Sequence, residues 1–143
     1  MISIFEVMTE LESMAARLAA SRMSADMREE LAKIHRRSEA YVPTEDFEKY
    51  DVANKAFHEL IYRGSWNDYL ERSVKDVRGR LRVYRRYPFQ KPGRIRQSFS
   101  DHAQILDAIL KGDDKAAGDA MRDHISIGGR VFADLVAEMG RRP

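Results

Sequence analysis

Three of the four histidines in this sequence are predicted to lie on different helices, from which their side chains could converge on one site. They are His58, His102 and His124, and Asn54 stands four residues before His58. Residues four apart share one face of a helix, so Asn54 and His58 should point the same way. Three imidazoles and an amide oxygen are a suitable ligand set for a divalent metal, because imidazole binds zinc, nickel, copper and iron. The alternative is that each histidine only packs or forms hydrogen bonds within a core.

A site of this kind could also activate water, which makes a helical metalloenzyme the main alternative function. An enzyme would need a general base within reach of the metal. Three carboxylates adjoin the histidines in the sequence, and we expect them to point to other helix faces: Glu59, Asp101 and Asp123. Without a general base in reach, we expect a protein that is not an enzyme. The fourth histidine, His35, stands beside two arginines and is predicted to be a surface residue.

The elements that would position these residues are predicted from periodicity and from helix breakers. Apolar residues recur at helical spacing, and Gly and Pro fall mainly between the periodic segments. No segment alternates apolar and polar residues as a half-buried strand does. The sequence thus predicts an all-α fold, an antiparallel bundle of six to seven helices in a single domain over residues 1–143. The expected helix starts are a capping box at residues 3–6, Ser24, Thr44, a cap within residues 65–68, the end of a Pro/Gly stretch over residues 88–93, and Gly112-Asp113.

Composition excludes several classes of protein. The chain has 143 residues, of which 43% are apolar, and this length suits one core. It has no cysteine, so disulfides, thiolate metal sites and cysteine nucleophiles are excluded. No apolar run approaches the roughly 20 residues that span a bilayer. The N-terminus lacks the features of a secretory signal, so we expect a cytoplasmic protein without membrane contact.

Basic residues cluster between Arg72 and Arg96, although the whole chain has a formal charge of only +2. This segment holds ten Lys and Arg residues and a single acid, Asp76. Three interpretations stay open: a solvated helix face, a nucleic-acid surface that neutralises phosphates, or a source of ligand-binding arginines. On a helical wheel, Arg78 and Arg85 lie roughly 60–80° from the centre of the apolar stripe, from where each could reach a buried carboxylate. We predict that these two arginines bind an effector.

Four segments carry motifs in a fixed order along nearly the whole chain, from about residue 5 to residue 139. They are residues 10–20, residues 54–67 with N-x-x-F-H and G-x-x-N, residues 101–109 with D-H-x-x-I-x-x-A-I, and residues 112–124 with G-D, A and M-x-x-H. Together they resemble the FCD domain, the C-terminal effector-binding domain of the FadR subfamily of GntR transcription regulators.

The resemblance implies a function and a set of roles. Asn54, His58, His102 and His124 would bind a divalent metal (zinc, nickel or manganese) at the floor of an effector cavity. The domain would form a homodimer, and effector binding would control DNA binding by an N-terminal winged helix-turn-helix domain, which we expect to be absent from this chain. Two positions depart from the family pattern. Asn54 stands where many members have Asp, and Met8 stands where members often have Arg.

The charge of the expected ligand set predicts the class of effector. Three neutral imidazoles and a neutral amide leave the +2 charge of a bound metal uncompensated. In a helical bundle of low dielectric constant, such a centre should attract an anion. We therefore predict a small carboxylate effector that completes the coordination of the metal.

Overall fold

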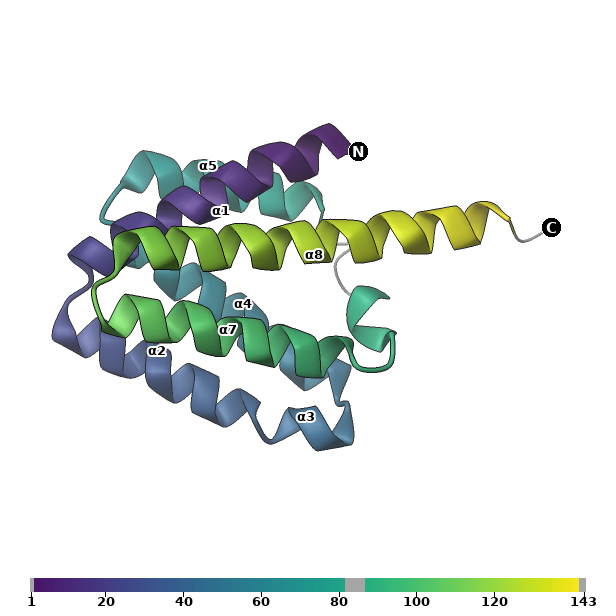
Figure 1. Ribbon diagram of the computed structural model, residues 1–143, viewed down its shortest axis with the longest axis horizontal. Coiled ribbons are helices and arrows are strands. Elements are labelled where there is room, and N and C mark those ends of the chain that lie inside the picture. Colours follow the sequence, from purple (N-terminus) through teal and green to yellow (C-terminus); the bar gives the residue numbers. More distant parts are fainter. Residues whose placement is uncertain (1, 82–86, 142–143) are drawn as a thin grey trace.

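The computed structural model describes residues 2–81 and 87–141, and every regular element in these two ranges is helical (Figure 1). This confirms the predicted all-α fold. The elements are α1 (Ile2–Arg22), α2 (Ala25–Ser38), α3 (Tyr41–Thr44), α4 (Phe47–Gly64), α5 (Asp68–Arg80), the 3-10 turn η1 (Tyr87–Gln90), α7 (Arg94–Leu110) and α8 (Asp114–Gly140).

The bundle brings the first and the last helix of the chain together. Helix α1 packs along α8, and it also contacts α4, α5 and α7 (Figure 1). Helix α7 reverses through a short turn into α8, and α2 packs against α4 and α7. The C-terminal part of α8 extends beyond the other helices (Figure 1). Helices α4, α7 and α8, which carry the candidate metal ligands, therefore all pack against α1.

Polar caps begin several of these helices where the sequence predicts them. The hydroxyl of Ser24 accepts a hydrogen bond from the backbone N–H three residues later, and the amide oxygen of Asn67 does the same at the start of α5. At the start of α8, Asp113 accepts from the N–H of Ala116. Each cap satisfies a backbone donor that the first turn of a helix leaves without a partner.

Two predicted helix starts were wrong. Helix α1 already includes Ser3, which therefore does not cap it. The helix expected to begin at Thr44 begins instead at Phe47, with Asp46 as its N-cap. The reason is Glu45, whose backbone is left-handed at φ 48°, so the chain turns between α3 and α4.

The main core lies between α1, α4, α7 and α8. Its largest side chains include Phe57, Ile61, Ile105 and Met121, all at most 1% exposed. Where α1 meets α8, small residues replace large ones. A Cβ at Gly118 would lie only 3.3 Å from Oγ of Ser13, whose hydroxyl donates to the Gly118 carbonyl. This close approach holds α1 against the helix that carries His124.

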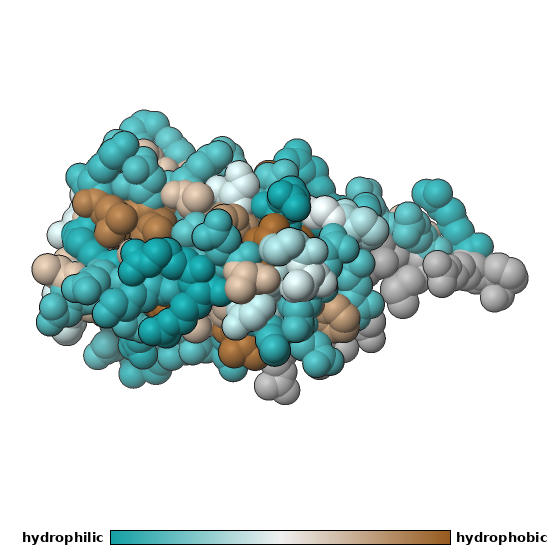
Figure 2. Space-filling model, turned by 90° about the horizontal axis from the view of Figure 1, so that it is seen from below, coloured by the Kyte–Doolittle hydropathy of each residue, from teal (hydrophilic) through white to brown (hydrophobic). Residues whose placement is uncertain are grey.

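The face of the molecule that Figure 2 shows is mainly hydrophilic. Seen from below the view of Figure 1, apolar side chains form small separate groups among hydrophilic ones (Figure 2). Across the described residues, none of the helices combines the length and the apolar character needed to cross a membrane.

Candidate metal centre

The structure brings His58, His102 and His124 together from α4, α7 and α8. One ring nitrogen of each lies within 4.8 Å of those of the other two, and all three side chains are buried. Asn54 lies one turn before His58 on α4 and is also buried. The rings of His58 and His102 have centroids 5.1 Å apart, and those of His102 and His124 are 4.7 Å apart. The three imidazoles predicted as ligands therefore form one compact group.

Two buried carboxylates orient two of the three imidazoles. Glu12 on α1 lies 3.1 Å from Nδ1 of His58, and Asp101 on α7 lies 2.8 Å from Nδ1 of His124. A carboxylate accepts a hydrogen bond, so we assign the proton to Nδ1 in both rings. Nε2 of both rings is then left with a lone pair. This carboxylate–histidine arrangement is the one that orients histidine ligands in metal proteins.

The third imidazole is held by ring contacts. His102 stacks on Phe57 with ring centroids 4.3 Å apart, and its Nε2 lies 3.2 Å from Nε2 of His124. Because Nδ1 of His124 carries its proton, the hydrogen between the two nitrogens belongs to Nε2 of His102, and Nε2 of His124 accepts it. When His102 carries its proton on Nδ1 instead, both Nε2 atoms offer a lone pair to one metal ion, so this pair of atoms is suited to metal binding.

Burial keeps these histidines neutral. It lowers the pKa of His58 to about 3, and the charge of Arg78 acts in the same direction. Burial also lowers the pKa of His102 well below its usual value, and the neighbouring histidines add to this effect. It lowers the pKa of His124 too, although Asp101 partly opposes it. Neutral imidazole is the form that binds metals, so the group is ready to bind a cation at neutral pH.

Two buried atoms of the site have no hydrogen-bond partner within the described ranges. They are Oδ1 of Asn54 and Nε2 of His58, both acceptors once Nδ1 of His58 carries the proton. A buried acceptor without a partner costs free energy, commonly about 1–3 kcal/mol. A metal ion would satisfy both atoms, and nitrogen and amide oxygen are donors that zinc, nickel and manganese accept. The residues present therefore fit a divalent ion.

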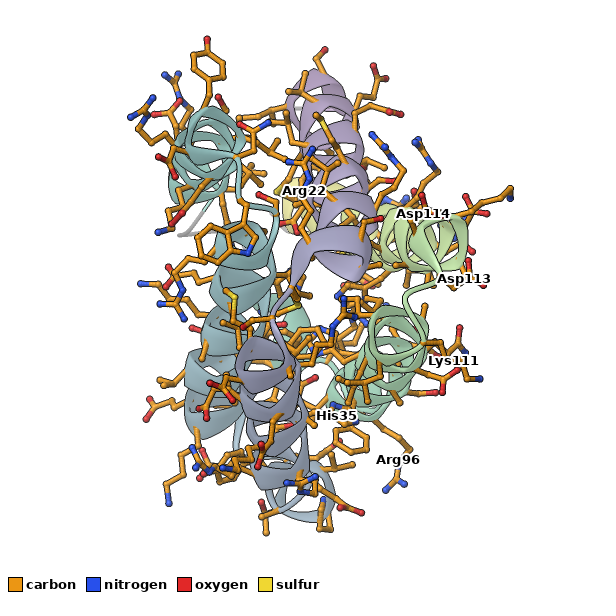
Figure 3. The ribbon with its side chains drawn as sticks, turned by 90° about the vertical axis from the view of Figure 1, so that its left-hand side faces the viewer. Arg22, His35, Arg96, Lys111, Asp113 and Asp114 are labelled. Atoms are coloured by element: carbon orange, nitrogen blue, oxygen red, sulfur yellow. The ribbon has the colours of Figure 1, made fainter. Side chains whose placement is uncertain are left out.

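His35 is buried, and the prediction that it lies on the surface was wrong. It stacks on Phe99 of α7 with ring centroids 4.2 Å apart, and it is 8% exposed. Figure 3 shows it on α2 at the junction with α7. Burial lowers its pKa. The neighbouring arginines suggested a solvated face, but position 35 belongs to the buried stripe that begins at Leu31.

Arg78, predicted to bind an effector, joins the site through Glu12. Its Nη1 donates to Oε1 of Glu12 and to the hydroxyl of Tyr62, both at 3.0 Å. The hydroxyl of Tyr62 donates to the same carboxylate. Arg78 therefore supports the carboxylate that orients His58, and its contact with an effector stays a prediction. Arg85 lies outside the described residues.

Sequence reasoning missed three residues of this site. Glu12 could have been found from its place on the buried face of α1, between Met8 and Ala15. Asp101 was expected to point away from the histidines, and this was wrong, because it faces α8 and bonds to His124. Asp123 is exposed, as predicted.

The third missed residue is Arg94, at the start of α7. Only 8% of it is exposed. It belongs to the basic segment for which three interpretations were open, but only Arg78 and Arg85 were singled out there as ligand-binding arginines. Burial lowers its pKa, an effect that the charge of Asp101 partly offsets. The guanidinium nevertheless stays protonated at any ordinary pH.

The charges around the histidines balance. Four charged side chains act on the three imidazoles: Glu12, Arg78, Asp101 and Arg94. Two are acidic and two are basic, and the histidines are neutral, so the group has no net charge. A divalent ion would therefore introduce a charge of +2 that these residues do not compensate.

Comparisons with known proteins agree with this architecture. The chain matches the family model of the FCD domain over residues 3–126. Its structure is similar to that of E. coli McbR/YncC, with a TM-score of 0.84 and 18% sequence identity over 94% of this chain and 64% of that chain. It is also similar to Streptococcus agalactiae GntR, with a TM-score of 0.72 and 26% identity over 90% of this chain and 57% of that one. The comparison with curated proteins gave no match.

The chain therefore spans less than two thirds of the length of both structural relatives. The family match, in contrast, covers most of the present sequence and includes all four candidate metal ligands. On this ground, the protein belongs to the FCD domain family.

Proposed function

We propose that this chain is the metal-dependent, effector-binding domain of a GntR-family transcription regulator. Asn54, His58, His102 and His124 bind a divalent ion (zinc, nickel or manganese), and a small carboxylate binds to that ion. The bound ion supplies positive charge and open coordination positions for the ligand. Effector binding then controls how an attached reader domain holds DNA.

The observation that carries this proposal is the group of three buried, neutral imidazoles from three different helices. Their ring nitrogens lie within 4.8 Å of one another, and buried carboxylates orient two of them. A purely structural role would not need Nε2 of His58 and Oδ1 of Asn54 to be left without partners among the described residues. Metal binding accounts for both atoms.

The charge balance supports a carboxylate as the effector. The surrounding acids and bases cancel, so the +2 charge of the ion is available to attract an anion into a site of low dielectric constant. The two acids of the site already accept hydrogen bonds, from His58 and His124 respectively. This favours ligand binding over hydrolysis, which would need a free base.

The reader domain and the dimer belong to the same proposal. Both structural relatives are longer than the matched region, which agrees with a DNA-binding domain outside residues 1–143. Trp66, which is 66% exposed, is a candidate contact between two copies of the domain. Phe132, the other residue considered for this contact, has a side chain outside the described part of the chain.

Metal analysis of the purified, tag-free domain tests the proposal. We expect near-stoichiometric metal in the unmodified domain and none in the His102→Ala/His124→Ala double variant, with unchanged helicity by circular dichroism. His35→Gln is the matched control, because His35 is also buried but lies outside the cluster. This variant should keep the metal. If the unmodified domain stays free of metal after incubation with zinc, nickel and manganese, the proposal is wrong.

Calorimetric titration of the zinc-loaded domain tests the carboxylate. Acetate and acetamide have the same shape but differ in charge, so the ion should bind acetate and not acetamide. Equal binding of the two compounds would contradict the assignment of a carboxylate effector while leaving the metal site intact.

A further inference from the structure

Arg94 is a buried arginine, and two of its three side-chain nitrogens bond to none of the described residues. It is 8% exposed, and its Nε and Nη1 have no hydrogen-bond partner among the residues that the structure describes. Buried arginines normally pair with carboxylates or carbonyls, because an isolated buried charge is costly. Asp101, the acid whose charge acts on it, already accepts hydrogen bonds from His124 and from Gln97.

The charge of Arg94 acts on one of the three histidines, His124. On α7, Arg94 stands seven residues before Asp101 and eight before His102, which is about two turns along the helix. On α8, Gly128 follows His124 by one turn. A Cβ at Gly128 would lie 3.6 Å from Nη2 of Arg94, so the guanidinium lies against α8 at a point where that helix has no side chain.

The balance of charges in the site indicates a ligand-binding role for Arg94. Its positive charge offsets that of Asp101, while Arg78 offsets that of Glu12. Once a divalent ion is bound, the site carries an excess of two positive charges. One carboxylate on the ion would leave half of that excess, whereas a ligand with two carboxylates would remove it.

We propose that Arg94 is a second anchor of the effector site and that the effector is a small dicarboxylate. One carboxylate binds the metal ion, and the other accepts two parallel N–H bonds from the guanidinium of Arg94. Guanidinium and carboxylate match each other in this bidentate geometry, which makes the contact directional as well as strong. This inference rests on the proposed metal site and specifies the chemical class of its ligand.

Calorimetry on the zinc-loaded domain tests this ligand class. The probes are malonate, succinate and glutarate, each compared with the half-amide in which one carboxylate is replaced by a neutral amide. We expect at least one diacid to bind about tenfold or more tighter than its half-amide, the effect of a charge-assisted pair of hydrogen bonds. In Arg94→Gln this preference should disappear, while zinc and half-amide binding remain.

Arg96→Gln is the matched control. Arg96 lies two residues further along α7, is exposed and points away from the bundle (Figure 3). The control should keep the full preference for the diacid. If the unmodified domain binds diacids and half-amides equally, or if Arg94→Gln keeps the preference, the assignment of Arg94 is wrong. Failure to bind zinc would contradict the proposed function instead, and it is observed before any diacid is added.

Stability of the metal-free, ligand-free domain is an independent readout. A buried charge whose partner is a ligand destabilises the ligand-free protein. Arg94→Met removes this charge and should therefore raise the urea midpoint of unfolding. If Arg94 instead supported the fold, the same variant would lower that midpoint. A lowered midpoint would overturn the inference even where the binding data are incomplete.

Discussion

Asp101 on α7 accepts a hydrogen bond from Nδ1 of His124 on α8 at a distance of 2.8 Å. This contact joins two of the three helices of the candidate metal centre and fixes which nitrogen of His124 faces the other imidazoles. Burial raises the pKa of Asp101, but the hydrogen bonds and charges of His124, Gln97 and Arg94 outweigh this effect, so the net pKa is lowered. Asp101 is therefore a carboxylate at neutral pH and can hold the His124 tautomer.

Replacement of Asp101 by Asn should weaken metal binding without unfolding the domain. The amide no longer stabilises the protonated Nδ1 by its charge, and loss of such a contact commonly costs about 10–100-fold in metal affinity. The affinity can be measured by competition with a coloured zinc chelator. Asp123→Asn is the control, because Asp123 is exposed beside the same histidine. Equal affinities in the two variants would show that Asp101 does not act on the metal site.

Glu12→Gln should destabilise the fold. Glu12 is fully buried and accepts hydrogen bonds from His58, Tyr62 and Arg78, so its loss of charge leaves the Arg78 guanidinium without a counter-charge. Breaking a buried ion pair on one side commonly costs about 3–5 kcal/mol. Urea denaturation of the metal-free domain measures this change.

The control for Glu12 is Glu10→Gln on the same helix. Glu10 pairs with Arg122 at the surface, where solvent screens the interaction, and its removal should leave the urea midpoint nearly unchanged. If both variants shift the midpoint equally, the buried network does not stabilise the protein as the contacts indicate.

The metal-free domain should lose stability as the pH falls below about 6.5. The pKa of His58 is lowered to about 3 in the folded protein, whereas an unfolded histidine titrates near 6.5. The unfolded chain therefore takes up a proton at a higher pH than the folded one, and protons favour unfolding from about pH 6.5 down toward pH 3. The lowered pKa values of His102 and His124 act in the same direction.

Urea midpoints at pH 7.5 and pH 5 measure this pH dependence above the range in which carboxylates titrate. The decrease should be smaller in His102→Ala/His124→Ala, which removes two of the buried rings. An unmodified domain whose midpoint is the same at both pH values would mean that the histidines take up protons without unfolding.

Two glycines should respond in opposite directions to alanine. At Gly64, the end of α4, a Cβ would lie 2.5 Å from Cγ of Met23, so Gly64→Ala should destabilise the domain by about 1–3 kcal/mol. At Gly79, near the exposed end of α5, no atom of the described residues beyond its chain neighbours and the local helix backbone lies within 4 Å of the added carbon. Gly79→Ala should therefore stabilise the helix by up to about 1 kcal/mol. Thermal unfolding of both variants tests this, and shifts of the same sign would be inconsistent with the packing.

Sequence patterns predicted the fold well because helices follow local rules. Ser24 and Asn67 cap helices as expected, since an N-cap depends only on its own side chain and on a backbone donor three residues away. The helix start predicted at Thr44 was wrong for a reason that periodicity does not reveal. Glu45 adopts a left-handed backbone conformation, and the helix therefore begins at Phe47.

Residue types and spacing alone identified the candidate ligands Asn54, His58, His102 and His124. Three of the four stand next to or one turn from residues of an apolar stripe, so their burial could be predicted from helical periodicity. Convergence of the three imidazoles, in contrast, depends on how α4, α7 and α8 pack, and spacing within one helix carries no information about that.

Only the tertiary structure decided the second layer of the site. Asp101 and Arg94 are charged residues, which sequence patterns place on solvated faces, and the place of Glu12 on the apolar face of α1 gives no indication of its partners. Their burial became possible because a partner on another helix, or a gap such as that at Gly128, was available in three dimensions. A buried charge is stable only where packing brings a counter-charge or donors to it, so its place is set by contacts between distant segments rather than by its neighbours in the chain.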